Sequence, residues 1–221
     1  MLIRLCLTSI SRFSELVYKR CASQKGRNQG LRRGANATVN TKTLRRPSNE
    51  TTPQTMHDGT ERQAPEIQVF RIYIEAPAQR VWDAITTGEF STKYGYGGIV
   101  EYDLREGGDY VSHTTEEMKR MGMGDVAVTG RVLESDPPSR LVQTWVAAWH
   151  QQETTLTWEL VEHEGPLTAL TLTHDCTGAQ NTARDVEGTG DARQGGGGWP
   201  WILAGMKTYL ETGHAMPGSG I

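Results

Sequence analysis

Three pairs of strand-like segments, each pair joined by a short turn, precede one long helix with an apolar face, and this order limits the folds open to the chain. The joining segments carry strong turn residues: Gly-Gly in 105–108, Pro-Pro in 135–139 and Gly-Pro in 163–166. Proline cannot continue a strand ladder, so each pair of segments should fold back on itself. Consecutive hairpins imply an antiparallel sheet. The predicted strand pairs are 99–104 with 109–114, 126–134 with 141–148, and 154–162 with 168–174.

A further strand and two helices are predicted before these hairpins. Residues 67–74 alternate apolar and polar side chains, which is typical of a half-buried strand. Pro77 suits the first turn of a helix that carries Trp82 on its apolar face and is expected to stop at Gly88. A short second helix is expected over 90–94.

The C-terminal helix is predicted over 199–212, after a long loop over 177–198 that is rich in Gly, Thr and Asp. It is the only predicted element long enough to lie across the concave face of a curved sheet. The sequence therefore predicts the α+β class, with a curved antiparallel sheet wrapped around the long C-terminal helix. The apolar stripe of this helix consists of Ile202, Leu203, Met206, Tyr209 and Leu210.

Charge separates a basic leader from the predicted domain. Residues 1–55 hold 11 of the 23 Lys and Arg but only 2 of the 26 acidic residues, so they carry +9 and residues 56–221 carry −12. An acidic domain argues against a nucleic-acid-binding face. The 3 cysteines cannot form a disulfide framework, no Cys or His pair has zinc-site spacing, and no apolar run approaches the ~20 residues of a membrane span. We expect no metal, no cofactor and no membrane span.

The leader has more than one interpretation. Residues 1–20 fit an amphipathic, Arg-containing helix of the kind found in mitochondrial presequences, and residues 22–65 are polar and without periodicity. Translation from Met56 would instead make the leader an extension without a function, and nucleic-acid binding by the leader is a third interpretation. We expect a cytoplasmic protein, or a mitochondrial one if the presequence is genuine. The predicted organisation is a disordered basic leader (1–65), one domain (66–214) and a flexible tail (215–221).

Four motifs give the chain a resemblance to a known superfamily. They occupy 74–85, 134–145, 170–174 and 197–213, within a likeness that covers about residues 66–214. The chain resembles the START-like (SRPBCC) superfamily, and within it the family of homologues of the activator of the heat-shock-protein-90 ATPase. This resemblance implies the helix-grip fold, with an elongated and mostly apolar cavity between sheet and C-terminal helix. Co-chaperone members of the family pair this domain with a separate N-terminal domain that engages the chaperone, and here the leader stands in its place.

Strand alternation assigns residues to the cavity that the resemblance implies. In the strand over 141–148, the face that carries Gln143 and Trp145 is assigned to the cavity, and Trp149 is a weaker candidate for the continuation of this face. The alternative for the large aromatics is ordinary core packing, which buries 150–250 Å² for such side chains in general. The predicted ligand-binding residues are Tyr110, Ser112, Gln143, Trp145, Trp158, Leu170, Leu172, His174, Ile202, Met206 and Tyr209.

His174 is the strongest polar candidate within this set. It ends a strand, and its ordinary pKa near 6.5 permits proton transfer. Tyr110 and Asp175 are weaker candidates for the same catalytic role, and the alternative for His174 is a structural hydrogen bond at the strand end. Cys176 lacks an adjacent base, which argues against a nucleophile.

Two loops are candidates for the cavity mouth. The loop over 177–198, which ends in four glycines, can act as a lid. Residues 116–124 contain three methionines among charged residues and fit either a surface turn with a short helix or a second edge of the mouth.

Three functions remain open from the sequence. The first is binding of a small hydrophobic molecule between sheet and helix. The second is a cyclase- or dehydratase-type enzyme that uses the same cavity, and the third is a partner protein that regulates a chaperone ATPase. We favour the first, because no catalytic constellation is recognisable.

Overall fold

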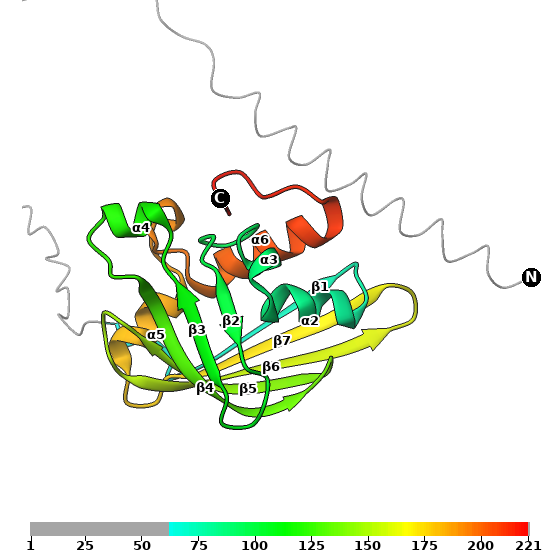
Figure 1. Ribbon diagram of the computed structural model, residues 1–221, viewed down its shortest axis with the longest axis horizontal. Helices are drawn as coiled ribbons and strands as arrows, with labels where there is room; N and C mark the ends of the chain where they lie inside the picture. Colours follow the sequence, from blue (N-terminus) through cyan, green and yellow to red (C-terminus); the bar gives the residue numbers. More distant parts are fainter. Residues whose placement is uncertain (1–61, 221) are drawn as a thin grey trace, which may run out of the picture. The chain divides into compact units, whose positions relative to one another are not determined.

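The computed structural model describes residues 62–220 of the chain. The predictions for residues 1–61, including the presequence and the start at Met56, lie outside the described residues. The described chain forms a seven-stranded antiparallel sheet in the order β1-β7-β6-β5-β4-β3-β2 (Figure 1). The strands are β1 (Ile67–Ile74), β2 (Val100–Tyr102), β3 (Asp109–His113), β4 (Val126–Asp136), β5 (Arg140–Ala147), β6 (Glu153–His163) and β7 (Leu167–Asp175).

The sheet curves, and the helices α2, α3 and α6 lie on its concave side (Figure 1). The helix α6 is the longest of the described helices and contacts the edge strand β1. The helices are α2 (Ala78–Thr86), α3 (Gly88–Ser91), α4 (Glu116–Arg120), α5 (Gln180–Glu187) and α6 (Gly198–Thr212), with a 3-10 turn over Ala192–Gln194. The predicted α+β helix-grip architecture is confirmed. No helix within residues 62–220 is long and apolar enough to cross a membrane.

The prediction of one long loop over 177–198 is wrong, because this segment contains α5. The buried face of α5 consists of Thr182, Ala183 and Val186, which are small or polar. The sequence therefore lacks the stripe of large apolar residues that would predict a helix here. The second short helix also begins earlier than predicted. It starts at Gly88 and ends at Ser91 rather than spanning 90–94.

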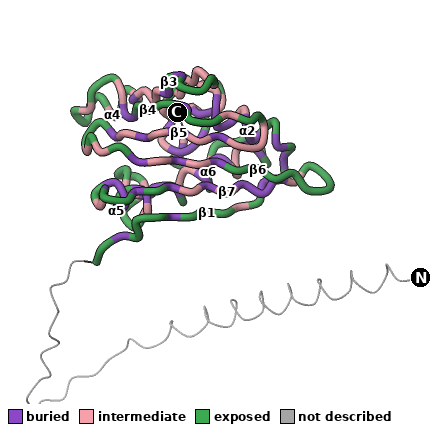
Figure 2. The backbone as a smooth tube through the Cα atoms, turned by 90° about the horizontal axis from the view of Figure 1, so that it is seen from below, coloured by how far each residue is buried: buried purple, intermediate pink, exposed green. Residues whose placement is uncertain are grey.

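Strand alternation puts one face of the sheet in the core. In β5 every second residue from Leu141 to Ala147 is buried, and β6 and β7 repeat the pattern (Figure 2). The register places Leu141 opposite Trp158 and Trp158 opposite Leu172, so these rows face the same side. This buried face is the concave one, which α6 covers. The tail residue Ser219 is also buried and donates a hydrogen bond from its hydroxyl to the carbonyl oxygen of Gly95.

Candidate functional site

The concave face of the sheet brings together all the predicted ligand-binding residues of the central strands. Gln143 lies opposite Leu156 on β6, and Leu156 lies opposite His174 on β7. Tyr110 lies on the same face, one strand beyond β4. The buried side chains of this group are Tyr110, Gln143, Trp145, Trp158, Leu170, Leu172 and His174.

His174 is fixed by two hydrogen bonds in the centre of this face. The indole Nε1 of Trp199 donates to His174 Nδ1 over 2.9 Å. The hydroxyl of Thr154 donates to the carbonyl oxygen of Trp145 and lies 2.8 Å from His174 Nε2. Because that hydroxyl has a single proton, it accepts the hydrogen of Nε2, and His174 is the neutral Nε2–H tautomer. Both ring nitrogens are therefore occupied by partners within the protein.

Burial disfavours the charged form of His174. The ring is fully buried between the indoles of Trp145 and Trp199, at centroid distances of 5.2 and 5.9 Å. This desolvation lowers the pKa of His174 from 6.5 to about 4, against a smaller opposing effect of Asp175. At neutral pH the imidazole is uncharged, and it has no free nitrogen with which to take a proton from a ligand.

The two residues that follow His174 do not form a catalytic site with it. Asp175 is exposed and accepts hydrogen bonds from the backbone and hydroxyl of Thr177, which lower the pKa of its carboxyl. Cys176 is fully buried, and this burial raises the pKa of its thiol to about 12. A buried, protonated thiol is a poor nucleophile.

A second polar cluster lies toward β2 and β3. The rings of Tyr102 and Tyr110 stack with centroids 4.5 Å apart, and the hydroxyl of Tyr102 donates to Gln143 Oε1 over 2.7 Å. Burial raises the pKa of both tyrosines, so both stay protonated. Tyr102 was not predicted, because its strand has three residues and shows no alternation. Ser112 lies beside this cluster and is half-buried.

Helix α6 presents a different stripe from the one predicted. The residues Trp199, Leu203, Met206 and Leu210 are buried, at spacings of four, three and four. Ile202 and Tyr209 are only half-buried; Ile202 lies beside Gly95, and the Tyr209 ring meets Phe90 edge-on. Trp199 was missed as a site residue, although its spacing from Leu203 and Met206 carries the signal. Its ring contacts Trp158 edge-on at 5.5 Å, so it closes the centre of the face.

Trp149 lies outside the concave face, because β5 ends at Ala147 and the chain turns before reaching it. Half of its surface is exposed. Its indole Nε1 donates to Asp185 Oδ2 over 2.9 Å, and the Nε2 atom of His150 lies 2.8 Å from the same oxygen. These two contacts join the β5–β6 turn to α5, so the segment predicted as a lid is held to the sheet through Asp185.

The methionine segment forms the short helix α4, which has no buried residue. Met121 is 67% exposed, whereas Met123 packs against the core. The interpretation as a surface turn with a short helix fits this arrangement.

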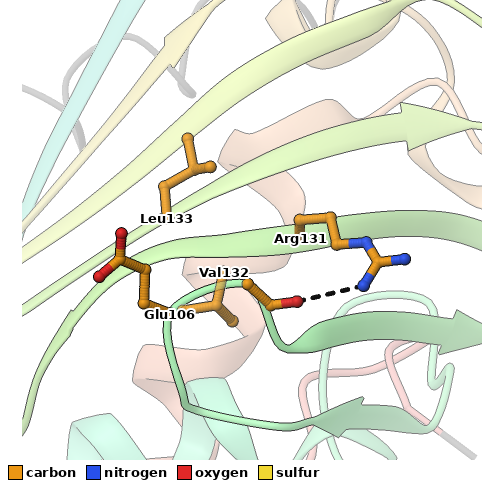
Figure 3. Close-up of a pocket in the computed structure, with 5 residues that line it drawn as sticks. Glu106, Arg131, Val132 and Leu133 are labelled. Atoms are coloured by element: carbon orange, nitrogen blue, oxygen red, sulfur yellow. Dashed lines mark hydrogen bonds between the residues drawn. The ribbon is translucent and has the colours of Figure 1, made fainter.

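Two pockets in the described residues open to solvent. One lies at the β2–β3 turn and is lined by Glu106, Gly107, Arg131, Val132 and Leu133 (Figure 3). There the guanidinium of Arg131 donates to the carbonyl oxygen of Gly107. The other lies between β1 and α6. Neither pocket is lined by any of the predicted ligand-binding residues, which pack instead against one another.

Comparison with solved structures finds similar proteins. A protein from Bordetella parapertussis is 22% identical with a TM-score of 0.51, and the match covers 71% of this chain and 80% of that one. DynU16, a putative protein in the dynemicin biosynthetic locus, is 21% identical with a TM-score of 0.51, over 68% of this chain and 49% of that one. CalU16 from Micromonospora echinospora is 24% identical with a TM-score of 0.47, over 66% and 77%. No curated protein matches the chain in sequence.

The family assignment comes from the sequence itself. Residues 75–211 match the family described as activator of Hsp90 ATPase homolog 1-like protein. The matched span runs from the end of β1 to the last turn of α6 and so contains nearly the whole sheet and the helix that covers it. The chain therefore belongs to the family of activator of Hsp90 ATPase homolog 1-like proteins.

Proposed function

We propose that this domain binds a small, mainly apolar and uncharged molecule between the concave face of the sheet and α6. The observation that carries the proposal is the chemistry of that face. Its large side chains are aliphatic or aromatic, and its buried polar groups are neutral. Such an environment favours an apolar ligand and penalises a charged one, because a charge would lose its hydration without gaining a partner.

Binding requires a rearrangement, because the predicted lining residues pack against one another. The segment that must move lies between β7 and α6 and contains α5. The described contacts that hold it include the hydrogen bonds of Asp185 to Trp149 and His150 and an exposed ion pair between Arg62 and Glu187. On its inner side, Gln68 Nε2 donates a buried hydrogen bond to the carbonyl oxygen of Ala183. Surface ion pairs contribute little, about 0–1 kcal/mol. We propose opening of α5 as the route for the ligand; it requires the buried hydrogen bond between Gln68 and Ala183 to break.

The cyclase-type alternative has less support. It depends on a group that can move a proton, and both nitrogens of His174 are already bonded to Trp199 and Thr154. Asp175 is exposed on the other face of β7. Regulation of a chaperone ATPase is supported only by the name of the family.

Native mass spectrometry of the full chain against fatty acids, sterols and aromatic polyketides tests the proposal. We expect a complex with one molecule of an uncharged apolar compound. Hydrogen exchange of the complex should show added protection in β5, β6, β7 and α6. Protection confined to the surface pocket of Glu106 and Arg131, or no complex with any compound, would contradict the proposal.

Loosening α5 should speed binding. Asp185→Ala removes the acceptor shared by Trp149 and His150, so we expect the association rate of the ligand to rise several-fold while the fold is kept. Glu106→Ala is the matched control, because it removes an exposed acidic side chain at the β2–β3 turn, away from α5. Stopped-flow tryptophan fluorescence measures both rates. Equal rates in the two variants would show that α5 is not the gate.

A further inference from the structure

Two hydrogen-bond donors on the concave face have no partner among the residues that the structure describes. Gln143 is fully buried, and its Nε2 atom is unpaired although its Oε1 atom accepts from Tyr102. The Nε1 atom of Trp158 is also buried and unpaired, with the residue 4% exposed. Buried polar groups in native proteins are nearly always hydrogen-bonded, so an unpaired donor calls for a specific explanation.

The two donors lie on neighbouring strands and on the same face of the sheet. Gln143 lies opposite Leu156, and Trp158 stands two residues further along β6 on the same face. Such diagonal positions on neighbouring strands are about 7–8 Å apart, which long side chains can span. The neighbouring indole of Trp199 already donates its N–H to His174, so it does not compete with Gln143 and Trp158 for an acceptor on a ligand.

We infer that the ligand carries a carbonyl oxygen that accepts hydrogen bonds from Gln143 Nε2 and Trp158 Nε1. This inference rests on the proposed function, and it names the class of ligand as a neutral, largely apolar carbonyl compound, for which ketones serve as the probes. A carbonyl oxygen has two lone pairs, so it can accept from both donors at once. An indole N–H can only donate, which rules out a hydroxyl proton or an ammonium group at this position. A carboxylate would also accept these bonds, but the nearby buried polar groups are neutral and give its charge no partner.

Pairs of compounds that differ only in the carbonyl group provide the test. Fluorenone is compared with fluorene, anthrone with dihydroanthracene, and benzophenone with diphenylmethane, by titration of the full chain with tryptophan fluorescence. We expect each bound ketone to bind at least about tenfold more tightly than its hydrocarbon, since one hydrogen bond to a buried donor is worth about that factor.

Variants then assign the preference to the two donors. Gln143→Met and Trp158→Phe should each reduce the ketone preference by about tenfold while hydrocarbon affinity changes little. Val161→Met is the matched control, because it changes an exposed side chain of β6 outside the concave face without altering a polar atom. This control should keep the full preference.

The outcomes separate the two proposals. If ketones and hydrocarbons bind the wild-type protein equally well, the carbonyl inference is overturned and the apolar ligand site stands. The same conclusion follows if the preference survives in both Gln143→Met and Trp158→Phe. If no compound of any pair binds, the ligand site itself fails, and the carbonyl inference fails with it.

Discussion

Gly130→Ala is expected to destabilise the domain by about 3 kcal/mol or more, because the added methyl group has no space. A Cβ atom at this position would lie 2.0 Å from the carbonyl oxygen of Thr144 and 3.3 Å from the ring of Tyr110. The first of these neighbours is backbone on the adjacent strand β5, so it cannot turn away as a side chain could. The strands would have to separate where the hydroxyl of Thr144 accepts a hydrogen bond from the backbone of Arg131.

Gly124→Ala is the matched control. A Cβ atom at Gly124 meets nothing within 4 Å, and its backbone lies outside the left-handed region, as does that of Gly130. The two substitutions therefore differ in space rather than in backbone conformation, and the control should change stability by less than about 1 kcal/mol. Urea denaturation measures both. Similar small effects would show that β4 and β5 are further apart here than the structure has them.

The consequences of Gly130→Ala should reach the site as well. Tyr110 lies directly over Gly130, stacks on Tyr102, and through it is linked to Gln143. A methyl group below Tyr110 would displace this stack from the concave face. The absence of a side chain at Gly130 thus explains how two tyrosines can fit at one end of the sheet.

The sequence predicted the hairpins because their turns are encoded locally. The prolines at 137 and 138 placed β5 at 141–148, within one residue of its bounds of Arg140–Ala147. Alternation likewise put Gln143, Trp145 and Trp158 on one face, since a strand's side-chain period of two needs no knowledge of its neighbours. The fold class followed from these two local signals.

The parts that could not be predicted depend on distant partners. The state of His174 is set by Trp199 and Thr154, which are 25 and 20 positions away in the chain. Helix α5 was missed because Thr182, Ala183 and Val186 bury too little apolar surface to give a recognisable stripe. Trp199 differs from these two cases, because its inward position could be predicted: its spacing from Leu203 and Met206 extends the apolar stripe by one turn toward the N-terminus.

Acid should destabilise this protein through His174. The pKa of this residue is lowered from 6.5 to about 4 in the folded state. Between pH 6.5 and pH 4, His174 is therefore protonated in the unfolded chain but neutral in the folded one. Stability is then complete above pH 6.5 and falls as the pH decreases toward 4. The expected loss between pH 7 and pH 5 is about 2 kcal/mol. The pKa values of Asp175 and Glu211 are also lowered in the folded state, from 3.8 and 4.5. These two groups therefore reduce stability mainly below about pH 4.5, and they contribute little to the loss between pH 7 and pH 5.

His174→Gln isolates this effect. The glutamine amide can accept from Trp199 and donate to Thr154, but it cannot be protonated in this range, so the variant should lose about 2 kcal/mol less than the wild type between pH 7 and pH 5. Gln143→Leu is the control on the same face; it removes a buried polar side chain but no titratable group, and it should keep the wild-type slope. The free energy of unfolding in urea at the two pH values gives all three slopes. An unchanged slope in His174→Gln would mean that the imidazole is protonated as readily in the folded protein as in the unfolded chain, and that His174 is free to exchange protons with a bound ligand after all.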